Sequence, residues 1–229
     1  MRNLKFENGE YYHIYNHAIE GRDLVLDRHD ANRWVMDLVE FNKVESIGSL
    51  REAMRPSRHK PHTYIPSHLV TGVAETERLV DIICRCLNPN HFHLVLSQRV
   101  EGGISAFMHK LGMGYSHYYN TRYQRKGRLY QDTFKATFVT DNDYLLYLSV
   151  YTNLNDKVHQ LPVRVSKELV RSSWGEYTER AEGPCDPSVI LKQFRSVNEY
   201  KRFAAKSLQE MLEAKKEQKE LRHIMFEFD

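Results

Sequence analysis

The pattern of hydrophobic and polar positions predicts β-strands in three parts of the chain. Residues 10–19 are rich in β-forming side chains, and residues 128–139 alternate between hydrophobic and polar positions. Between them, residues 76–86 lead through the turn-forming residues 88–90 into a second β-prone run at residues 91–96. These segments supply the strands of one sheet.

The first predicted helix follows the first strand. Trp34, Leu38 and Phe41 recur at helical spacing, so they form one face that can pack on a core. Asp27 or Asp30 can cap the start of this helix, which we expect to end near residue 44.

Two further helices are predicted on either side of the last strand. Hydrophobic residues recur at helical spacing from residue 104 to about residue 123, where Gly112 and Gly114 weaken the helix but permit close packing. Residues 141–143 can cap a third helix, which covers residues 144–155. The chain therefore alternates between strands and helices.

This order predicts an α+β fold, with a ferredoxin-like antiparallel sheet backed by helices. The chain has 229 residues and is 41% hydrophobic, so it can bury one good core. We expect one main domain over residues 1–160 and a mostly helical C-terminal extension over residues 161–229, with a charged surface helix from about residue 197 to 220. The basic, proline-containing residues 46–73 are expected to be a loop that touches DNA or a solvated linker.

Composition excludes several classes. No apolar run is long enough to span a membrane, and the N-terminus lacks the apolar core of a signal peptide, so we expect a cytoplasmic protein. Cys84, Cys86 and Cys185 are the only cysteines. The first two are strand neighbours that cannot readily form a disulfide, so buried thiols in a reduced compartment are expected. A zinc site that combines a cysteine with His91 or His93 is the alternative.

Positive charge is concentrated in one part of the chain. The net charge of +3 does not by itself indicate nucleic acid binding. Between residues 104 and 135, however, Asp132 is the single acid among six basic residues: Lys110, Arg122, Arg125, Lys126, Arg128 and Lys135. Tyrosines and a phenylalanine lie between them, which favours a groove for single-stranded nucleic acid. The alternative is a solvated basic helix with half-buried tyrosines.

Two histidines provide the candidate metal site. Side chains at positions i and i+2 of a strand project to the same side, so His91 and His93 can present both imidazoles together. His13, Tyr15 and His17 share one face of the first strand, and they would line a site near the His91 strand if the two strands pair. The alternative, and the more common role of a strand histidine, is a hydrogen bond to a backbone group.

The last predicted helix supplies a further pair. Tyr151 and Asn155 are four residues apart and would share a helix face, so one could bind a metal while the other acts as a nucleophile. Two imidazoles and an amide oxygen leave room for water and phosphate oxygens on Mg²⁺ or Mn²⁺. A tyrosine with a pKa of about 10 needs activation to react. The alternative for Tyr151 is a core residue with its hydroxyl at the rim.

The motifs together resemble a known family. In order, residues 12–16, 88–95, 104–123, 127–131 and 143–155 are similar to the single-tyrosine HUH transposases of the REP-associated and IS200-like type. The resemblance extends from about residue 10 to residue 180 and includes the element at residues 174–177.

The resemblance implies an HUH catalytic domain over residues 1–160 that cuts and rejoins single-stranded DNA near hairpins. It implies that His91, His93 and Asn155 hold a divalent metal, Mg²⁺ or Mn²⁺, and that Tyr151 attacks the scissile phosphate. The product would be a 5′-phosphotyrosine adduct with a free 3′-hydroxyl, and a second 3′-hydroxyl would reverse the reaction. Relatives include monomers and homodimers that exchange their tyrosine helices.

Two positions depart from the family pattern. Val150 stands where the family has arginine, and Asp156 stands where it has proline. Loss of the cation and gain of the acid are both expected to weaken phosphate binding. Two alternatives to the transposase therefore stay open. One is a domesticated protein that binds hairpin DNA through residues 110–135 without cutting, and the other is a metal-dependent phosphoesterase that uses water.

Overall fold

The computed structural model describes residues 4–44 and 77–226 of the chain, with side chains as far as residue 218. The predicted basic loop at residues 46–73 lies outside the described residues. Within the described part, no helix is both long enough and apolar enough to cross a membrane.

Five strands form one sheet in the order β4-β1-β3-β2-β5, and each neighbouring pair is antiparallel. The strands are β1 (Tyr11–His17), β2 (Val80–Leu87), β3 (His91–Gln98), β4 (Lys135–Phe138) and β5 (Arg171–Ser172). With the helices, the first four follow the order β1-α1-β2-β3-α3-β4, which is the ferredoxin-like arrangement. The predicted fold class is confirmed.

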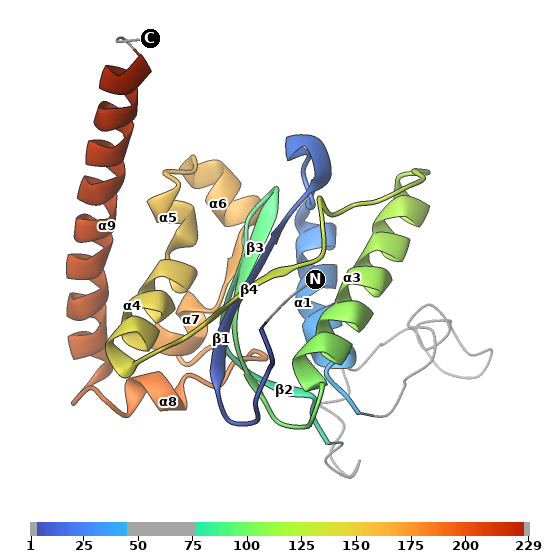
Figure 1. The fold of residues 1–229 in the computed structure, drawn as a ribbon, viewed down its shortest axis with the longest axis horizontal. Coiled ribbons are helices and arrows are strands. Elements are labelled where there is room, and N and C mark those ends of the chain that lie inside the picture. Colours follow the sequence, from blue (N-terminus) through green and yellow to red (C-terminus); the bar gives the residue numbers. More distant parts are fainter. Residues whose placement is uncertain (1–3, 45–76, 227–229) are drawn as a thin grey trace.

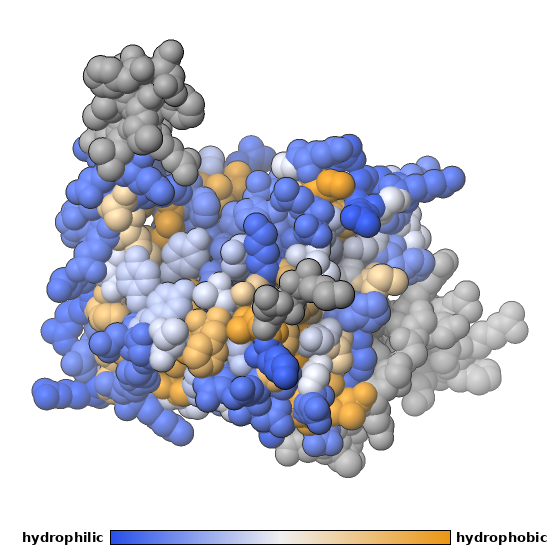
Figure 2. Space-filling model, viewed as in Figure 1, coloured by the Kyte–Doolittle hydropathy of each residue, from blue (hydrophilic) through white to orange (hydrophobic). Residues whose placement is uncertain are grey.

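Helices cover both faces of the sheet (Figure 1). One face carries α1 (Arg28–Glu40) and α3 (Gly103–Arg122), and α4 (Asn142–Asn153), α5 (Asn155–Val158), α7 (Trp174–Thr178) and α9 (Val197–Phe226) lie on the other side. The short elements η1 (Ile19–Gly21), α6 (Val163–Leu169) and α8 (Ser188–Leu191) complete the described chain. On the face seen in Figure 2, hydrophilic residues cover most of the surface, including the outer side of α9.

Helix α1 forms as its sequence predicts. The Asp27 side chain caps it by accepting hydrogen bonds from the backbone N–H groups of His29 and Asp30, at 2.9 and 3.0 Å. Trp34 is fully buried, as the helical spacing implies. A Cβ at Gly114 of α3 would overlap the ring of Phe41, so the predicted close approach at this glycine is confirmed.

Two hydrophobic clusters lie on the two faces of the sheet. Phe92 and Leu94 of β3 point into the cluster under α1 and α3, whereas Val95 points into the cluster under α4. Tyr177 and Tyr200 from the C-terminal part are buried in this second cluster. The C-terminal part is helical, as predicted, and it also adds β5 to the sheet edge. The division at residue 160 stays a prediction.

The last predicted strand is shorter than expected. Of residues 128–139, only Lys135–Phe138 form β4. Before it, the Asp132 carboxylate accepts a hydrogen bond from the N–H of Thr133 at 3.0 Å, and Asn16 donates to the Asp132 carbonyl at 2.9 Å. Such side-chain bonds to the backbone compete with a strand ladder, so the chain bends between the isolated bridge of Tyr130 with Ala18 and the start of β4.

Candidate active site

Strand pairing brings the histidines of β1 and β3 onto one face. His17 is the register partner of His91, and Tyr15 is the partner of His93. Paired residues project to the same side of a sheet, and the rings of His17 and His91 stack with centroids 4.9 Å apart. The prediction that the β1 side chains line the His91 strand is confirmed.

His91 and Asn155 meet at the centre of this face. His91 Nδ1 lies 2.7 Å from Asn90 Oδ1, an atom that only accepts, so Nδ1 carries the ring proton and Nε2 is a lone-pair acceptor. This Nε2 lies 3.1 Å from Asn155 Oδ1, which is also an acceptor. The Asn88 amide lies between them, with Nδ2 at 2.9 Å from His91 Nε2 and 2.6 Å from Asn155 Oδ1. Two lone pairs therefore converge on one donor.

This donor set fits a hard divalent cation. Neighbouring ligands on an octahedral ion with bonds of about 2.1 Å are separated by about 3.0 Å, close to the His91–Asn155 distance of 3.1 Å. His93 Nδ1 is 2.9 Å from His13 Nε2, so its Nε2 is the nitrogen left for a ligand. Asn155 Nδ2 is buried without a hydrogen-bond partner among the described residues. His91, His93 and Asn155 are the residues that would hold the ion.

Burial keeps these imidazoles neutral. Desolvation lowers the pKa of His91 to about 4, against an opposing hydrogen bond from Asn155, and it lowers the pKa of His13 to about 4. The pKa of His93 falls well below its ordinary value, again mainly through desolvation. Neutral imidazole is the form that binds metals, so the ring lone pairs are available at neutral pH.

The alternative zinc site would need a cysteine thiolate as a ligand beside His91 or His93. Burial raises the pKa of Cys84 to about 12, and it raises the pKa of Cys86 further, so both thiols are protonated at neutral pH. Across residues 4–44 and 77–226, no group of three or more His, Cys, Asp and Glu side chains is arranged to hold a metal ion. The donor set described above combines two imidazoles with the oxygen of an asparagine.

Tyr151 lies on α4, and its ring is next to the histidines of β1 and β3. Its ring centroid is 5.3 Å from that of His93, edge to face, and 6.1 Å from that of His13. Burial raises the pKa of the Tyr151 phenol, and the nearby Asn155 side chain opposes that rise. The phenol is therefore protonated at neutral pH.

The prediction that Tyr151 and Asn155 share one helix was wrong. Helix α4 ends at Asn153, and Leu154, with φ −111° and ψ 24°, separates it from α5, which begins at Asn155. The side chains of Tyr151 and Asn155 still lie close enough for Asn155 to affect the pKa of the Tyr151 phenol. The break therefore turns the backbone without separating the two groups.

The two departures from the family pattern have different environments. Val150 is fully buried in the hydrophobic cluster under α4, so its side chain does not lie at the site. The half-buried Asp156 lies beside Asn155 in α5 and raises the pKa of the Cys86 thiol after the larger effect of burial. An acid therefore lies near the site, whereas position 150 belongs to the core.

The six predicted DNA-binding cations are separated by the sheet. Lys135 is the register partner of Tyr15, which is in turn paired with His93, so Lys135 belongs to the face of the site. The other five, Lys110, Arg122, Arg125, Lys126 and Arg128, lie on α3 or in the segment that follows it, toward the opposite face.

Three of those five contact other residues of the protein, and the Arg125 guanidinium lies over the ring of Tyr119, 5.6 Å from its centroid. Arg122 forms ion pairs of 2.6 Å with both Asp27 and Asp30, and Lys110 donates to the carbonyl of Lys43 at 2.7 Å. These contacts hold α3 in place.

The tyrosines of α3 are largely structural. Tyr115 and Tyr119 are buried, and the hydroxyls of Tyr118 and Tyr123 donate to the Asp30 carboxylate at 2.8 and 2.7 Å. Their rings pack between α3 and α1, so they do not form the stacking groove predicted for nucleic acid. The alternative from the sequence, a basic helix whose tyrosines are at least half-buried, describes these residues better.

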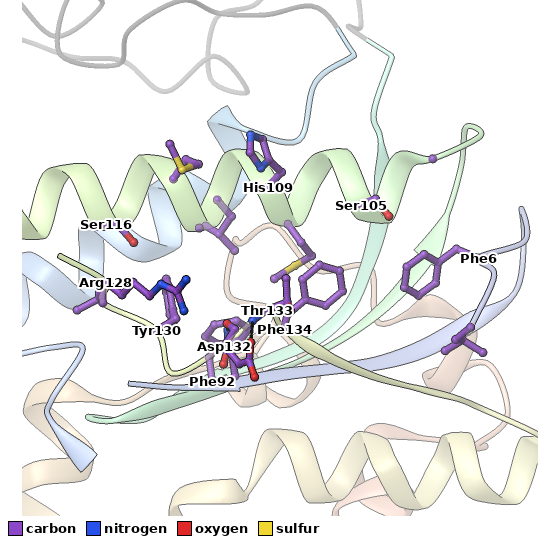
Figure 3. A pocket seen from close by; sticks show the side chains of 18 of the residues that line it. Phe6, Phe92, Ser105, His109, Ser116, Arg128, Tyr130, Asp132, Thr133 and Phe134 are labelled. Carbon is purple, nitrogen blue, oxygen red and sulfur yellow. Dashed lines mark hydrogen bonds between the residues drawn. The ribbon is translucent and has the colours of Figure 1, made fainter. Parts of the chain in front are cut away.

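A cavity of about 1370 Å³ lies on that opposite face, between α3 and the segment before β4 (Figure 3). Phe92, Tyr130 and Phe134 line it together with Arg128. Phe92 alternates with His91 and His93 along β3, so the sheet separates this cavity from Tyr151. This cavity is therefore not the candidate active site.

Of three further contributors to the site, Asn88, His13 and His159, the sequence indicated only His13, as a residue that lines the site. Asn88 was considered only as a turn residue, although its amide bridges His91 and Asn155. His13 contacts His93 through a ring nitrogen, and the ring of His159 lies 4.9 Å from that of His91. The strand alternation that groups His13 with Tyr15 was a signal for the second of these, but no pattern indicated the other two roles.

Comparisons with known proteins agree with this architecture. The family model described as "Transposase IS200 like" matches residues 61–154. A solved structure, described as the REP-associated tyrosine transposase bound to a REP hairpin, superposes with a TM-score of 0.50 and 12% identity, covering 81% of this chain and 93% of that one. No curated protein matches the chain. The family match bears out the resemblance to IS200-like transposases over residues 61–154, and the structural match confirms the fold. The family match includes His91, His93 and Tyr151 and ends just before Asn155.

Proposed function

We propose that this protein is a metal-dependent transposase that nicks and rejoins single-stranded DNA near hairpins through a 5′-phosphotyrosine intermediate. The observation that carries the proposal is the convergence of His91 Nε2 and Asn155 Oδ1 at 3.1 Å, beside the ring of Tyr151, whose centroid lies 5.3 Å from that of His93. A metal-binding pair and a nucleophile therefore lie within one buried polar cluster.

His91, His93 and Asn155 would hold Mg²⁺ or Mn²⁺, which would offset negative charge on the scissile phosphate. His13 orients His93 through its ring nitrogen, and Asn88 holds His91 and Asn155 in register. These contacts fix the ligands before DNA arrives, which lowers the reorganisation needed for reaction.

The Tyr151 oxygen attacks the phosphorus, and the bond from phosphorus to the 3′ oxygen of the preceding nucleotide breaks. The phenol loses one proton and the leaving 3′ oxygen gains one, so the products are a 5′-phosphotyrosine adduct and a free 3′-hydroxyl. Attack by a second 3′-hydroxyl reverses the exchange and joins strands. The adduct conserves the phosphodiester bond, so no nucleoside triphosphate is needed.

The test uses hairpins with single-stranded flanks, taken from the DNA around the gene and labelled at the 3′ end. These are incubated with Mn²⁺ or Mg²⁺ and separated on a denaturing protein gel. A labelled protein band is expected for the wild type and for Tyr147→Phe, which alters an exposed tyrosine one turn earlier on α4. The band should be absent for Tyr151→Phe and in a chelator.

Other outcomes would contradict the proposal. Hairpin binding without cleavage would identify a domesticated DNA-binding protein. Cleavage without any protein-bound DNA would identify a phosphoesterase that uses water. Whether the protein acts as a homodimer stays a prediction, which sedimentation of the hairpin complex would test.

A further inference from the structure

The face of α9 that packs on the core changes from buried residues to an exposed lysine where the helix passes the candidate active site. Tyr200, Ala204, Ser207 and Met211 recur at helical spacing and are buried against the core. The next position on this stripe is Lys215, which is exposed. A lysine therefore occupies the helix face that the earlier turns use for packing.

Contacts hold Lys215 at the end of α5. Its Nζ donates to the carbonyl of Val158 at 3.0 Å and lies 3.5 Å from His159 Nδ1. The His159 ring is in turn 4.9 Å from the ring of His91, at an interplanar angle of 63°. Lys215 thus reaches the border of the proposed metal site through one intervening imidazole, from a helix that begins at Val197.

The Lys215 charge has little to neutralise it. Among the described residues, Lys215 has no carboxylate within ion-pair distance, whereas Lys206 on the same helix pairs with Glu210 at 3.7 Å. An ammonium has three donors, and Val158 and His159 account for two of them. A donor therefore remains for a ligand from solvent.

A second cation borders the site from the other side. Lys135 follows Tyr15 and His93 in a cross-strand row, and it lowers the pKa of His17 after the larger effect of burial. Lys215 lowers the pKa of His91 and of His159 in the same secondary way. The site thus lies between a lysine on β4 and a lysine on α9.

We propose that Lys215, with His159, binds a backbone phosphate of the DNA strand next to the scissile phosphate, so that the strand crosses the site between Lys135 and Lys215. This inference rests on the proposed function for its substrate. It also explains how a chain with Val150 in the core and Asp156 near the site attracts a polyanion, because positive charge comes from the C-terminal helix. Lys215 is a binding residue and takes no part in the proton transfers.

The experiment measures binding without cleavage. A fluorescent hairpin with a single-stranded flank is titrated with full-length protein in a chelator over a series of salt concentrations, and anisotropy gives the association constant. The association constant falls with salt, and loss of one phosphate contact on a single strand makes the slope of log K against log salt shallower by about 0.7. Lys215→Gln should show this loss, and Lys215→Arg should retain the wild-type slope.

Lys206→Gln is the matched control. It removes an equal charge from α9 about two and a half turns earlier, which is the opposite side of the helix. It should leave the salt slope unchanged, and circular dichroism melting should give the same midpoint for all three variants. A wild-type slope for Lys215→Gln would overturn the inference, as would an equal loss in Lys206→Gln.

The outcome is distinguishable from the fate of the proposed function. If the wild type forms the Tyr151 adduct but Lys215→Gln keeps its slope, the function stands and the role of Lys215 is wrong. If no adduct forms but the slope depends on Lys215, the DNA-binding role stands without the chemistry. Absence of any binding by the wild type would overturn both.

Discussion

His91 Nε2 lies 3.1 Å from Asn155 Oδ1, although the two residues are 64 positions apart in the chain. The contact joins the start of β3 to the start of α5, and both atoms are hydrogen-bond acceptors. The Asn88 amide donates to both acceptors. The pair is thus arranged to receive a cation, and the account depends on that arrangement.

The contact between His13 and His93 predicts an effect on metal affinity. His13 Nε2 lies 2.9 Å from His93 Nδ1 and orients the ring. Loss of such an orienting partner weakens metal binding by about 10- to 100-fold. We expect His13→Ala to show this loss for Mn²⁺ in isothermal titration calorimetry. His117→Ala, which alters an exposed histidine of α3, should bind as the wild type does. Equal affinities for the two variants would show that His13 does not support the ligand.

The lowered histidine pKa values predict how stability depends on pH. His13 and His91 each have a pKa of about 4 in the folded protein, below the value of about 6.5 in the unfolded chain. The unfolded state therefore binds more protons, so stability is complete above about pH 6.5 and is lost as the pH falls toward 4. Between about pH 6.5 and 5, each histidine should lower the free energy of unfolding by on the order of 2 kcal/mol.

Urea unfolding of the metal-free protein across that range measures this loss. His13→Gln should make the dependence on pH shallower, because it removes one of the titrating groups. His117→Gln provides the comparison, since it lies on the other side of the sheet. If His13→Gln were as sensitive to pH as the wild type, the buried histidine would not be the cause.

Substitution of Asp30 is expected to cause a large loss of stability. Its buried carboxylate pairs with Arg122 and accepts the hydroxyls of Tyr118 and Tyr123, which ties α1 to α3. Removing one partner of a buried ion pair costs about 3–5 kcal/mol. Asp30→Ala should lower the free energy of unfolding by this amount. Glu168→Ala, in an exposed pair with Arg164, should change it by less than about 1 kcal/mol. Similar small changes in both variants would contradict the role of Asp30.

Local patterns in the sequence predicted much of the site. The strand alternation placed His91 and His93 on one face, and the β-forming residues before His17 indicated the strand that pairs with them. Both inferences depend on the two-residue period of a strand, which side-chain packing does not alter. Helical spacing paired Tyr151 with Asn155, and the resemblance to a known family implied the roles of nucleophile and metal ligand for them.

Other features depend on packing between distant segments. From the sequence, the tyrosines near α3 were expected to line a nucleic acid groove. In the structure they contact Asp30 of α1, which is about 90 positions away in the chain. The helix break at Leu154 leaves no signal of its own, because leucine is a good helix former. The sequence does not distinguish Lys215 from the other charged residues of the surface helix, because its place beside the site depends on how α9 packs on the core.

The central claim is that Tyr151 is the nucleophile, and peptide mapping of the DNA adduct tests it most directly. The protein is incubated with a hairpin and Mn²⁺, digested with nuclease and protease, and analysed by tandem mass spectrometry. The account predicts a single modified peptide, with a 5′-phosphonucleotide on Tyr151. Attachment to another residue, such as Tyr15 or Tyr147, would contradict it, and so would cleaved DNA with no modified peptide.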